Sequence, residues 1–207
     1  MLALEHLFRI DVELAVQQFI LNRVPWLMRV LSCVYYSHIV LGVAFYVYCY
    51  TFFQRSQYQR IRRTMALENI IAFVILSLWR CTPPRLLPDE YGFIDVLHKD
   101  RVKSTWTHNK FQLIIAAMPS LHFGNSVFLA FCLVNFSPHR FLRKIAPVWP
   151  VMMGLTIVAT ANHYILDAVV GTGVIALAYH FNWVMLILLP VERVLFRIVR
   201  LEKPKSS

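Results

Sequence analysis

Residues 31–53 read LSCVYYSHIVLGVAFYVYCYTFF and contain no Asp, Glu, Lys or Arg. Only His38 could carry a charge near neutral pH in this run. A helix needs about 20 predominantly apolar residues to cross the hydrocarbon core of a bilayer, and this run is long enough. The run therefore predicts a transmembrane helix, and it makes a membrane protein the first expectation for the whole chain.

The composition agrees with that expectation. Of the 207 residues, 58% are hydrophobic, whereas soluble domains are roughly half apolar or less. The formal net charge of +10 would indicate nucleic-acid binding in a soluble protein. Here the basic residues cluster between apolar runs, as topology signals do. We therefore expect the bilayer, and no nucleic acid, as a partner.

Four more apolar runs predict membrane helices at roughly 64–79, 119–136, 146–161 and 165–189. The expected fold is an all-α integral membrane protein, a helical bundle of five to six transmembrane helices. The expected divisions are an amphipathic or first membrane helix at 1–30, a transmembrane domain at 31–190, and a basic cytoplasmic tail at 191–207.

The segment 1–22 has two interpretations. Arg9, Asp11 and Glu13 interrupt its apolar pattern, and charges at mid-bilayer are costly. We favour an amphipathic helix lying in the interface over a sixth span whose charges pair inside the bundle.

The distribution of positive charge predicts the orientation. Basic residues gather at 54–63, at 137–144 and after residue 190. These segments share one side if all five spans cross, and the positive-inside rule places that side in the cytoplasm. Arg85, His122 and His163 then meet at the opposite face, which is extracytoplasmic or lumenal.

His122 and His163 lie in motifs that could support catalysis. In AAMPSLHFG (116–124), Pro119 suits the first turn of a helix and Ser120 suits an N-cap, with His122 directly after. In ATANHYILDAVVG (159–171), His163 and Asp167 are four apart and so would share a helix face. A carboxylate there can accept one imidazole N–H and leave the other nitrogen free as a nucleophile or base.

An anion site is expected where these motifs meet. The helices that begin near Pro119 and near His163 would both direct free N–H groups and positive dipole ends at that region. Arg85, in TPPRLLP (82–88), adds a planar guanidinium that suits a phosphate. Two histidines, a carboxylate, an arginine and two helix starts indicate phosphoryl transfer.

The motifs PPRLLP, AAMPSLH and NHYILD, in this order, resemble the signature of the type-2 phosphatidic acid phosphatase superfamily. The resemblance covers roughly residues 30–190 and looks closest to the inositolphosphotransferase branch, which contains the fungal inositol phosphorylceramide synthases. It implies a six-helix membrane fold and metal-independent catalysis through a phosphohistidine, without a cofactor.

The resemblance also implies a role for each matching residue. His163 attacks phosphorus, Asp167 orients His163, and His122 protonates the leaving oxygen. Arg85 and the Ser120 hydroxyl hold phosphate oxygens. A water or an alcohol then attacks the phosphohistidine, with His122 removing its proton.

This chain departs from the superfamily pattern at four positions. Leu78 and Leu86 stand where the first motif has Lys and Pro, and Thr156 and Ile157 where the third has Ser and Arg. Two basic phosphate ligands are thus missing. The inositolphosphotransferase branch relaxes the same positions. Basic residues in the segment 80–118, which the predicted topology places on the extracytoplasmic side, could replace the missing ligands: Lys99, Arg101, Lys103 and Lys110.

The expected function is that of a membrane phosphotransferase acting on a lipid phosphate ester. It would transfer phosphoinositol or another headgroup to a lipid alcohol, or instead hydrolyse a lipid phosphate or pyrophosphate. A catalytically silent lipid-binding protein is the alternative from another class, because of the two missing basic residues. The expected location is an endomembrane or the plasma membrane, and no oligomeric state is predicted.

Two smaller expectations concern cysteine and glycine. The four cysteines form no CxxC pair, so neither a zinc site nor a disulfide framework is expected. Gly171, Gly173 and Ala176 are expected to form a small-residue packing face between helices.

Overall fold

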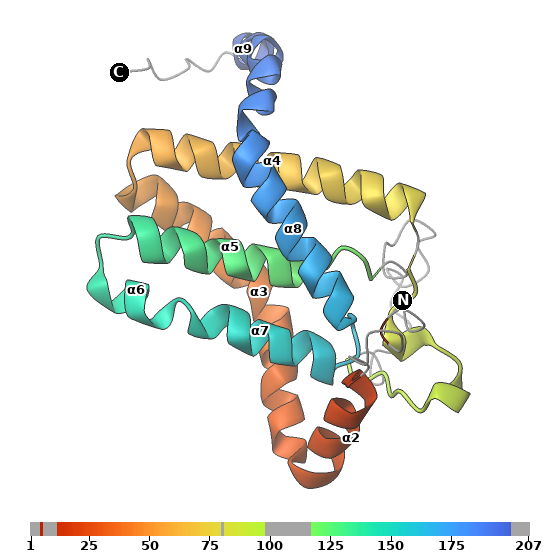
Figure 1. The fold of residues 1–207 in the computed structure, drawn as a ribbon. Helices are drawn as coiled ribbons and strands as arrows, with labels where there is room; N and C mark the ends of the chain where they lie inside the picture. The colour runs from red at the N-terminus through yellow and green to blue at the C-terminus, as the bar shows by residue number, and fades with distance from the viewer. Residues whose placement is uncertain (1–4, 6–11, 80, 98–116, 200–207) are drawn as a thin grey trace.

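The computed structural model describes residue 5 and residues 12–79, 81–97 and 117–199. Within these ranges every regular element is a helix (Figure 1). The α-helices are α2 (Glu13–Arg23), α3 (Pro25–Phe52), α4 (Arg55–Leu78), α5 (Leu121–Phe136), α6 (Arg140–Ile145), α7 (Val148–Ala159), α8 (Ile165–Phe181) and α9 (Leu189–Ile198). Three short 3₁₀ helices are η1 (Pro84–Leu86), η2 (Asp89–Tyr91) and η5 (Asn182–Leu188). The all-α prediction is confirmed.

Helices occupy all five predicted membrane runs. Among the described residues, three segments are long and apolar enough to cross a bilayer: Pro25–Phe52, Arg140–Ala159 and Ile165–Leu195. α5 is apolar but shorter, with 16 residues. α3 and α4 begin earlier than predicted, because Pro25 suits the first turn of α3 and Gln54 with Gln57 forms a capping box ahead of α4. The chain is therefore an integral membrane protein with a helical bundle.

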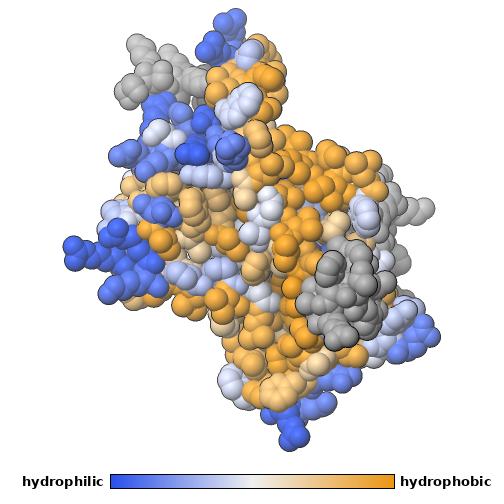
Figure 2. All heavy atoms as spheres, viewed as in Figure 1, coloured by the Kyte–Doolittle hydropathy of each residue, from blue (hydrophilic) through white to orange (hydrophobic). Residues whose placement is uncertain are grey.

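α8 packs against α4 and α5, and α7 packs against α3 and α5. Near one end of the bundle, a buried apolar cluster joins α3, α4, α5 and α8. It consists of Phe45, Cys49, Phe53, Ile61, Phe128, Cys132 and Ile175. The outer faces of the helices are also apolar, and Figure 2 shows hydrophobic side chains gathered over α7 and α8. Exposed Val151 and Val169 belong to these faces, which in a membrane protein contact lipid.

α5 and α8 make their closest approach at two glycines. A Cβ on Gly171 would lie 2.3 Å from the carbonyl oxygen of Ser120, and a Cβ on Gly124 would lie 2.8 Å from the carbonyl oxygen of Gly171. Gly173 has no atom within 4 Å of its Cβ position, and Ala176 is exposed. The predicted packing face is therefore correct for Gly171 and wrong for Gly173, whereas Ala176 lines a shallow pocket between α5 and α8 without close packing.

The basic segments gather at one end of the bundle. The Tyr48 hydroxyl of α3 lies 2.6 Å from Nδ1 of His139, in the turn before α6. At the start of α4, Arg62 pairs with Glu192 of α9 at 3.1 Å. Figure 1 shows the end of α4, the start of α5, the end of α7 and the start of α8 at the other end. Segments far apart in sequence thus meet there, and this end holds the candidate site.

α2 brings the N-terminal part of the chain to the same end. It has 11 residues and packs on α7 and α3. Its Glu13 and Gln17 are buried, and the Gln17 side chain exchanges two hydrogen bonds of 2.9 Å with the backbone of Ile94. Glu13 and Gln17 of α2 therefore face the protein, whereas Gln18, Asn22 and Arg23 are exposed. The position of residues 1–22 in the membrane interface stays a prediction.

Candidate active site

His163 lies in the turn that connects α7 to α8, before the first residue of α8. In this turn Ala161 has a φ of 54°, a left-handed conformation that is uncommon for alanine. The interpretation that His163 and Asp167 share a helix face is therefore wrong, because the chain enters the helix only at Ile165. The turn nevertheless brings Nδ1 of His163 to 3.8 Å from Oδ2 of Asp167.

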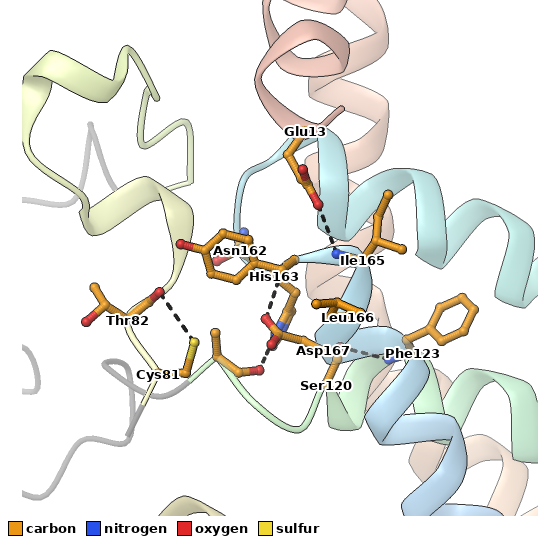
Figure 3. Close-up of polar contacts among 12 residues, drawn as sticks. Glu13, Cys81, Thr82, Ser120, Phe123, Asn162, His163, Ile165, Leu166 and Asp167 are labelled. Carbon is orange, nitrogen blue, oxygen red and sulfur yellow. Dashed lines mark hydrogen bonds and ion pairs between the residues drawn. The ribbon is translucent and has the colours of Figure 1, made fainter. Parts of the chain in front are cut away.

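The His163 ring is oriented by a backbone carbonyl. Its Nδ1 lies 2.6 Å from the carbonyl oxygen of Ala117 and so donates a hydrogen bond to it (Figure 3). Nδ1 thus carries the proton, and Nε2 keeps its lone pair. The sequence predicted Asp167 as this acceptor. Asp167 Oδ2 instead accepts the Tyr164 N–H at 2.8 Å and caps α8.

His122 projects from the start of α5 into a group of aromatic rings. Its ring centroid lies 5.6 Å from that of His163, 4.2 Å from that of His38 and 4.6 Å from the nearly parallel ring of Tyr35. The sequence analysis did not assign Tyr35 and His38 to the site. Their spacing of three residues places them on one face of α3, and this was the available signal.

Arg85 contacts the turn that carries His163. Its Nε donates to Oδ1 of Asn162 at 2.7 Å, and its backbone N–H donates to the Ala161 carbonyl at 3.0 Å. Nη1 lies 3.6 Å from Asp95, and the side chain is only 6% exposed. Arg85 therefore lies beside the turn, and Asn162 is a site residue that the sequence analysis missed.

Ser120 lies where the start of α5 meets α8. It is fully buried, its Oγ accepts the Phe123 N–H at 3.4 Å, and its own N–H donates to the Asp167 carbonyl at 3.0 Å. Ser120 is the N-cap of α5, as predicted. These contacts join α5 to α8, and the contact of the Ser120 hydroxyl with a phosphate oxygen stays a prediction.

Three carboxylates cap the start of α8. Asp167 accepts the N–H of Tyr164, Glu13 accepts that of Ile165 at 3.0 Å, and Glu5 accepts that of Leu166 at 3.1 Å. Figure 3 shows the contact from Glu13 beside His163. The N-terminus of α8 is therefore occupied by the protein's own acids, and its expected role as an anion site is wrong. No described residue accepts the N–H groups of Leu121 and His122 at the start of α5, so that helix start can still serve an anion.

We expect Glu13→Ala to destabilise the protein, because it leaves the half-buried N–H of Ile165 without an acceptor. Such a loss costs about 1–3 kcal/mol, and the melting temperature should fall by about 2–4 °C per kcal/mol. Activity should also fall, because the turn that carries His163 leads into this helix start. Glu13→Gln keeps an oxygen acceptor and is the matched control. An unchanged melting temperature in Glu13→Ala would contradict the contact.

Glu5 and Glu13, which both cap the start of α8, predict that the stability of the fold depends on pH. Burial raises the pKa of the Glu5 carboxyl from 4.5 to about 7, and the nearby Glu13 carboxylate adds to the effect. The folded state thus holds a proton that the unfolded chain releases at lower pH. The corresponding stability is complete below about pH 4.5 and is lost as the pH rises through about 7. Glu13→Gln should lose less stability over this range than the wild type in melting experiments.

The residues at the departing motif positions supply no basic phosphate ligand. Leu78 is exposed, and Thr156 and Ile157 are fully buried in α7, so none of them replaces a basic phosphate ligand. The four basic residues proposed to compensate fall outside the described residues. Within the described ranges, no group of three or more His, Cys, Asp and Glu is arranged to hold a metal ion.

Comparison with known proteins identifies the family of the chain. No curated protein and no solved structure matches the chain. The sequence profile of the PAP2 superfamily matches residues 1–181, which include helices α2 to α8, the turn with His163 and both histidine motifs. The chain therefore belongs to the PAP2 superfamily.

Proposed function

We propose that this protein transfers or hydrolyses the phosphoryl group of a lipid phosphate ester through a phosphohistidine on His163. Membership of the PAP2 superfamily supports a lipid phosphatase or phosphotransferase. The observation that carries the proposal is how the His163 ring is held and what lies next to it. Its Nδ1 proton is held by the Ala117 carbonyl, and the ring lies 5.6 Å from that of His122. This arrangement suits a neutral nucleophile next to a general acid.

In the first step, Nε2 of His163 attacks phosphorus while the bond from phosphorus to the leaving oxygen breaks. His122 donates a proton to that oxygen. The His163 ring keeps its Nδ1 proton and becomes positive when its lone pair is used. Asp167, at 3.8 Å from Nδ1, offsets this charge without forming the orienting hydrogen bond.

In the second step, the oxygen of a water or an alcohol attacks phosphorus and the P–N bond breaks. The proton of the attacking hydroxyl passes to His122, and His163 returns to its neutral state. Arg85 and the N–H groups of Leu121 and His122 are the proposed partners of the phosphate oxygens. Ser120 acts through its position, because it holds the start of α5 against Asp167.

The lipid alcohol as second acceptor, with phosphoinositol as the transferred group, is the more specific form of the proposal. It is supported by the relaxed motif positions, where Leu86 and Ile157 stand in place of proline and arginine. Hydrolysis uses the same residues and differs only in the acceptor. We further propose that the site lies on the extracytoplasmic or lumenal face of an endomembrane or the plasma membrane, opposite the basic segments.

The proposal is tested by incubating the purified protein in phospholipid micelles with labelled phosphatidylinositol, phosphatidic acid and an isoprenyl pyrophosphate, each with and without ceramide. We expect release of phosphate from at least one substrate, or a labelled product that appears only with ceramide. Chelators should not change the rate. Loss of activity with EDTA and its recovery with Mg²⁺ would contradict metal independence. No turnover of any substrate would favour a silent lipid-binding protein.

A further inference from the structure

A cavity of about 250 Å³ begins beside the site, where His38 and His122 line its end. It runs between α3, α5 and α7, and the rest of its wall is mostly apolar. Ile39, Val43, Phe128 and Trp149 belong to this wall. Ile39 and Val43 are 66% and 61% exposed on the outer face of α3. The cavity therefore opens sideways, toward the region that acyl chains occupy in a bilayer.

A second cavity of about 360 Å³ continues the first one along α3 and shares Phe45, Leu129 and Trp149 with it. It reaches Tyr48, at the basic end of the bundle. From residue 38 to residue 48, α3 rises about 15 Å at 1.5 Å per residue. The two cavities form an apolar groove with a polar end at the histidines, which we call the α3–α5 groove. Its size fits a small-molecule site of roughly 300–1,000 Å³.

The polar end of the groove holds an amide oxygen without a partner. Asn125 lies one turn after His122 on α5 and lines the first cavity. Its Oδ1 is buried and has no hydrogen-bond partner among the described residues. A hydroxyl can both donate and accept a hydrogen bond, so it can satisfy this amide in either orientation. Among the described residues that line the two cavities there is no Lys or Arg, so a neutral hydroxyl suits this end better than a phosphate.

Gly42 keeps the groove open. It lines the first cavity, and a Cβ at its position would meet no atom within 4 Å. Glycine in the middle of a helix is unfavourable for the helix itself, so local propensity does not explain its presence. A larger side chain at this position would occupy the space between α3 and α5.

We propose that the α3–α5 groove binds a long-chain alcohol that accepts the phosphoryl group. The hydroxyl lies at Asn125 and His122, and the alkyl chain follows the apolar wall toward Tyr48. The lack of a side chain at Gly42 leaves the space that this alkyl chain occupies. The inference rests on the proposed function and names the acceptor of its second step.

Binding is tested independently of turnover with hexadecanol that carries a diazirine on its chain. After illumination in phosphatidylcholine vesicles, mass spectrometry should find the label on peptides from α3 and α5. Excess hexadecanol should compete, and hexadecane should not. Gly42→Leu fills the groove and should lower this labelling about 10-fold. Gly173→Leu is the matched control, because Gly173 is also a mid-helix glycine with open space and lies outside the groove.

Turnover provides the second measurement. The preference for hexadecanol over butanol as acceptor should fall about 10-fold in Gly42→Leu and stay at the wild-type value in Gly173→Leu. Unchanged labelling and preference in Gly42→Leu, with an active wild type, would overturn the groove while leaving the proposed function intact. Gly42→Leu could instead slow the reaction of a long-chain donor and leave the preference for hexadecanol over butanol unchanged. This result would also overturn the alcohol site, because the donor chain would then occupy the groove. Labelling that falls in Gly42→Leu in a protein without turnover would support the alcohol site and refute the proposed function.

Discussion

Replacing His163 by alanine is expected to reduce turnover by ~10⁴-fold or more, as observed when an enzyme loses its nucleophile. The variant removes the nitrogen that forms the covalent bond, and neither Asp167 nor His122 lies where it can substitute for Nε2. The wild type, quenched during turnover of a ³²P-labelled phosphate ester, should carry an acid-labile and base-stable adduct. His163→Ala should carry none.

Two further histidine variants make this result specific. His180→Ala removes an exposed histidine from the far part of α8 and should leave turnover and adduct unchanged. His122→Ala should slow turnover by ~10²-fold or more, the usual effect of losing a general acid. It should still form the adduct from an ester whose leaving group needs no proton. An adduct that persists in His163→Ala would place the nucleophile elsewhere and refute the mechanism.

The helices were predictable because hydropathy is a local property. The run at 31–53 has no formal charge, and that alone indicates a helix in a bilayer. The starts of helices were harder to predict. α3 begins at Pro25, before Arg29, and α4 begins at Arg55, within a basic segment, so both begin ahead of their uncharged apolar runs. A hydropathy pattern marks the part of a helix that lies in hydrocarbon, whereas capping residues mark where the helix begins.

The convergence of His122 and His163 was predictable from the number of crossings between them. The individual contacts were not. The acceptor of the His163 proton is a backbone carbonyl, and any residue type could provide it. Glu13 and Ile165 are 152 residues apart in sequence, and only tertiary packing brings them together. For the same reason, Tyr35 and His38 could be placed on one face of α3 but not beside His122.

The close crossing of α5 and α8 gives the last prediction, which concerns Gly171→Ala. The added Cβ would lie 2.3 Å from the carbonyl oxygen of Ser120, and backbone atoms cannot move aside as the end of a side chain can. The two helices must separate, which typically costs about 1–3 kcal/mol and so lowers the melting temperature by about 2–4 °C per kcal/mol. Separation also stretches the hydrogen bond from Ser120 to Asp167.

The effect on activity should exceed the effect on stability. Ser120 caps the helix that carries His122, and Asp167 lies in the first turn of the helix that follows His163, so their separation moves the proposed acid away from the nucleophile. A displacement of about 1 Å can cost ~10²-fold in rate, and we expect a loss of this size in protein that remains folded. Gly173→Ala, two residues further along α8, adds the same methyl group where nothing lies within 4 Å, and it should keep full activity. If both variants behave like the wild type, the contact between α5 and α8 does not set the distance between the two histidines. Loss of activity in Gly171→Ala alone would show that this crossing fixes the geometry of the site.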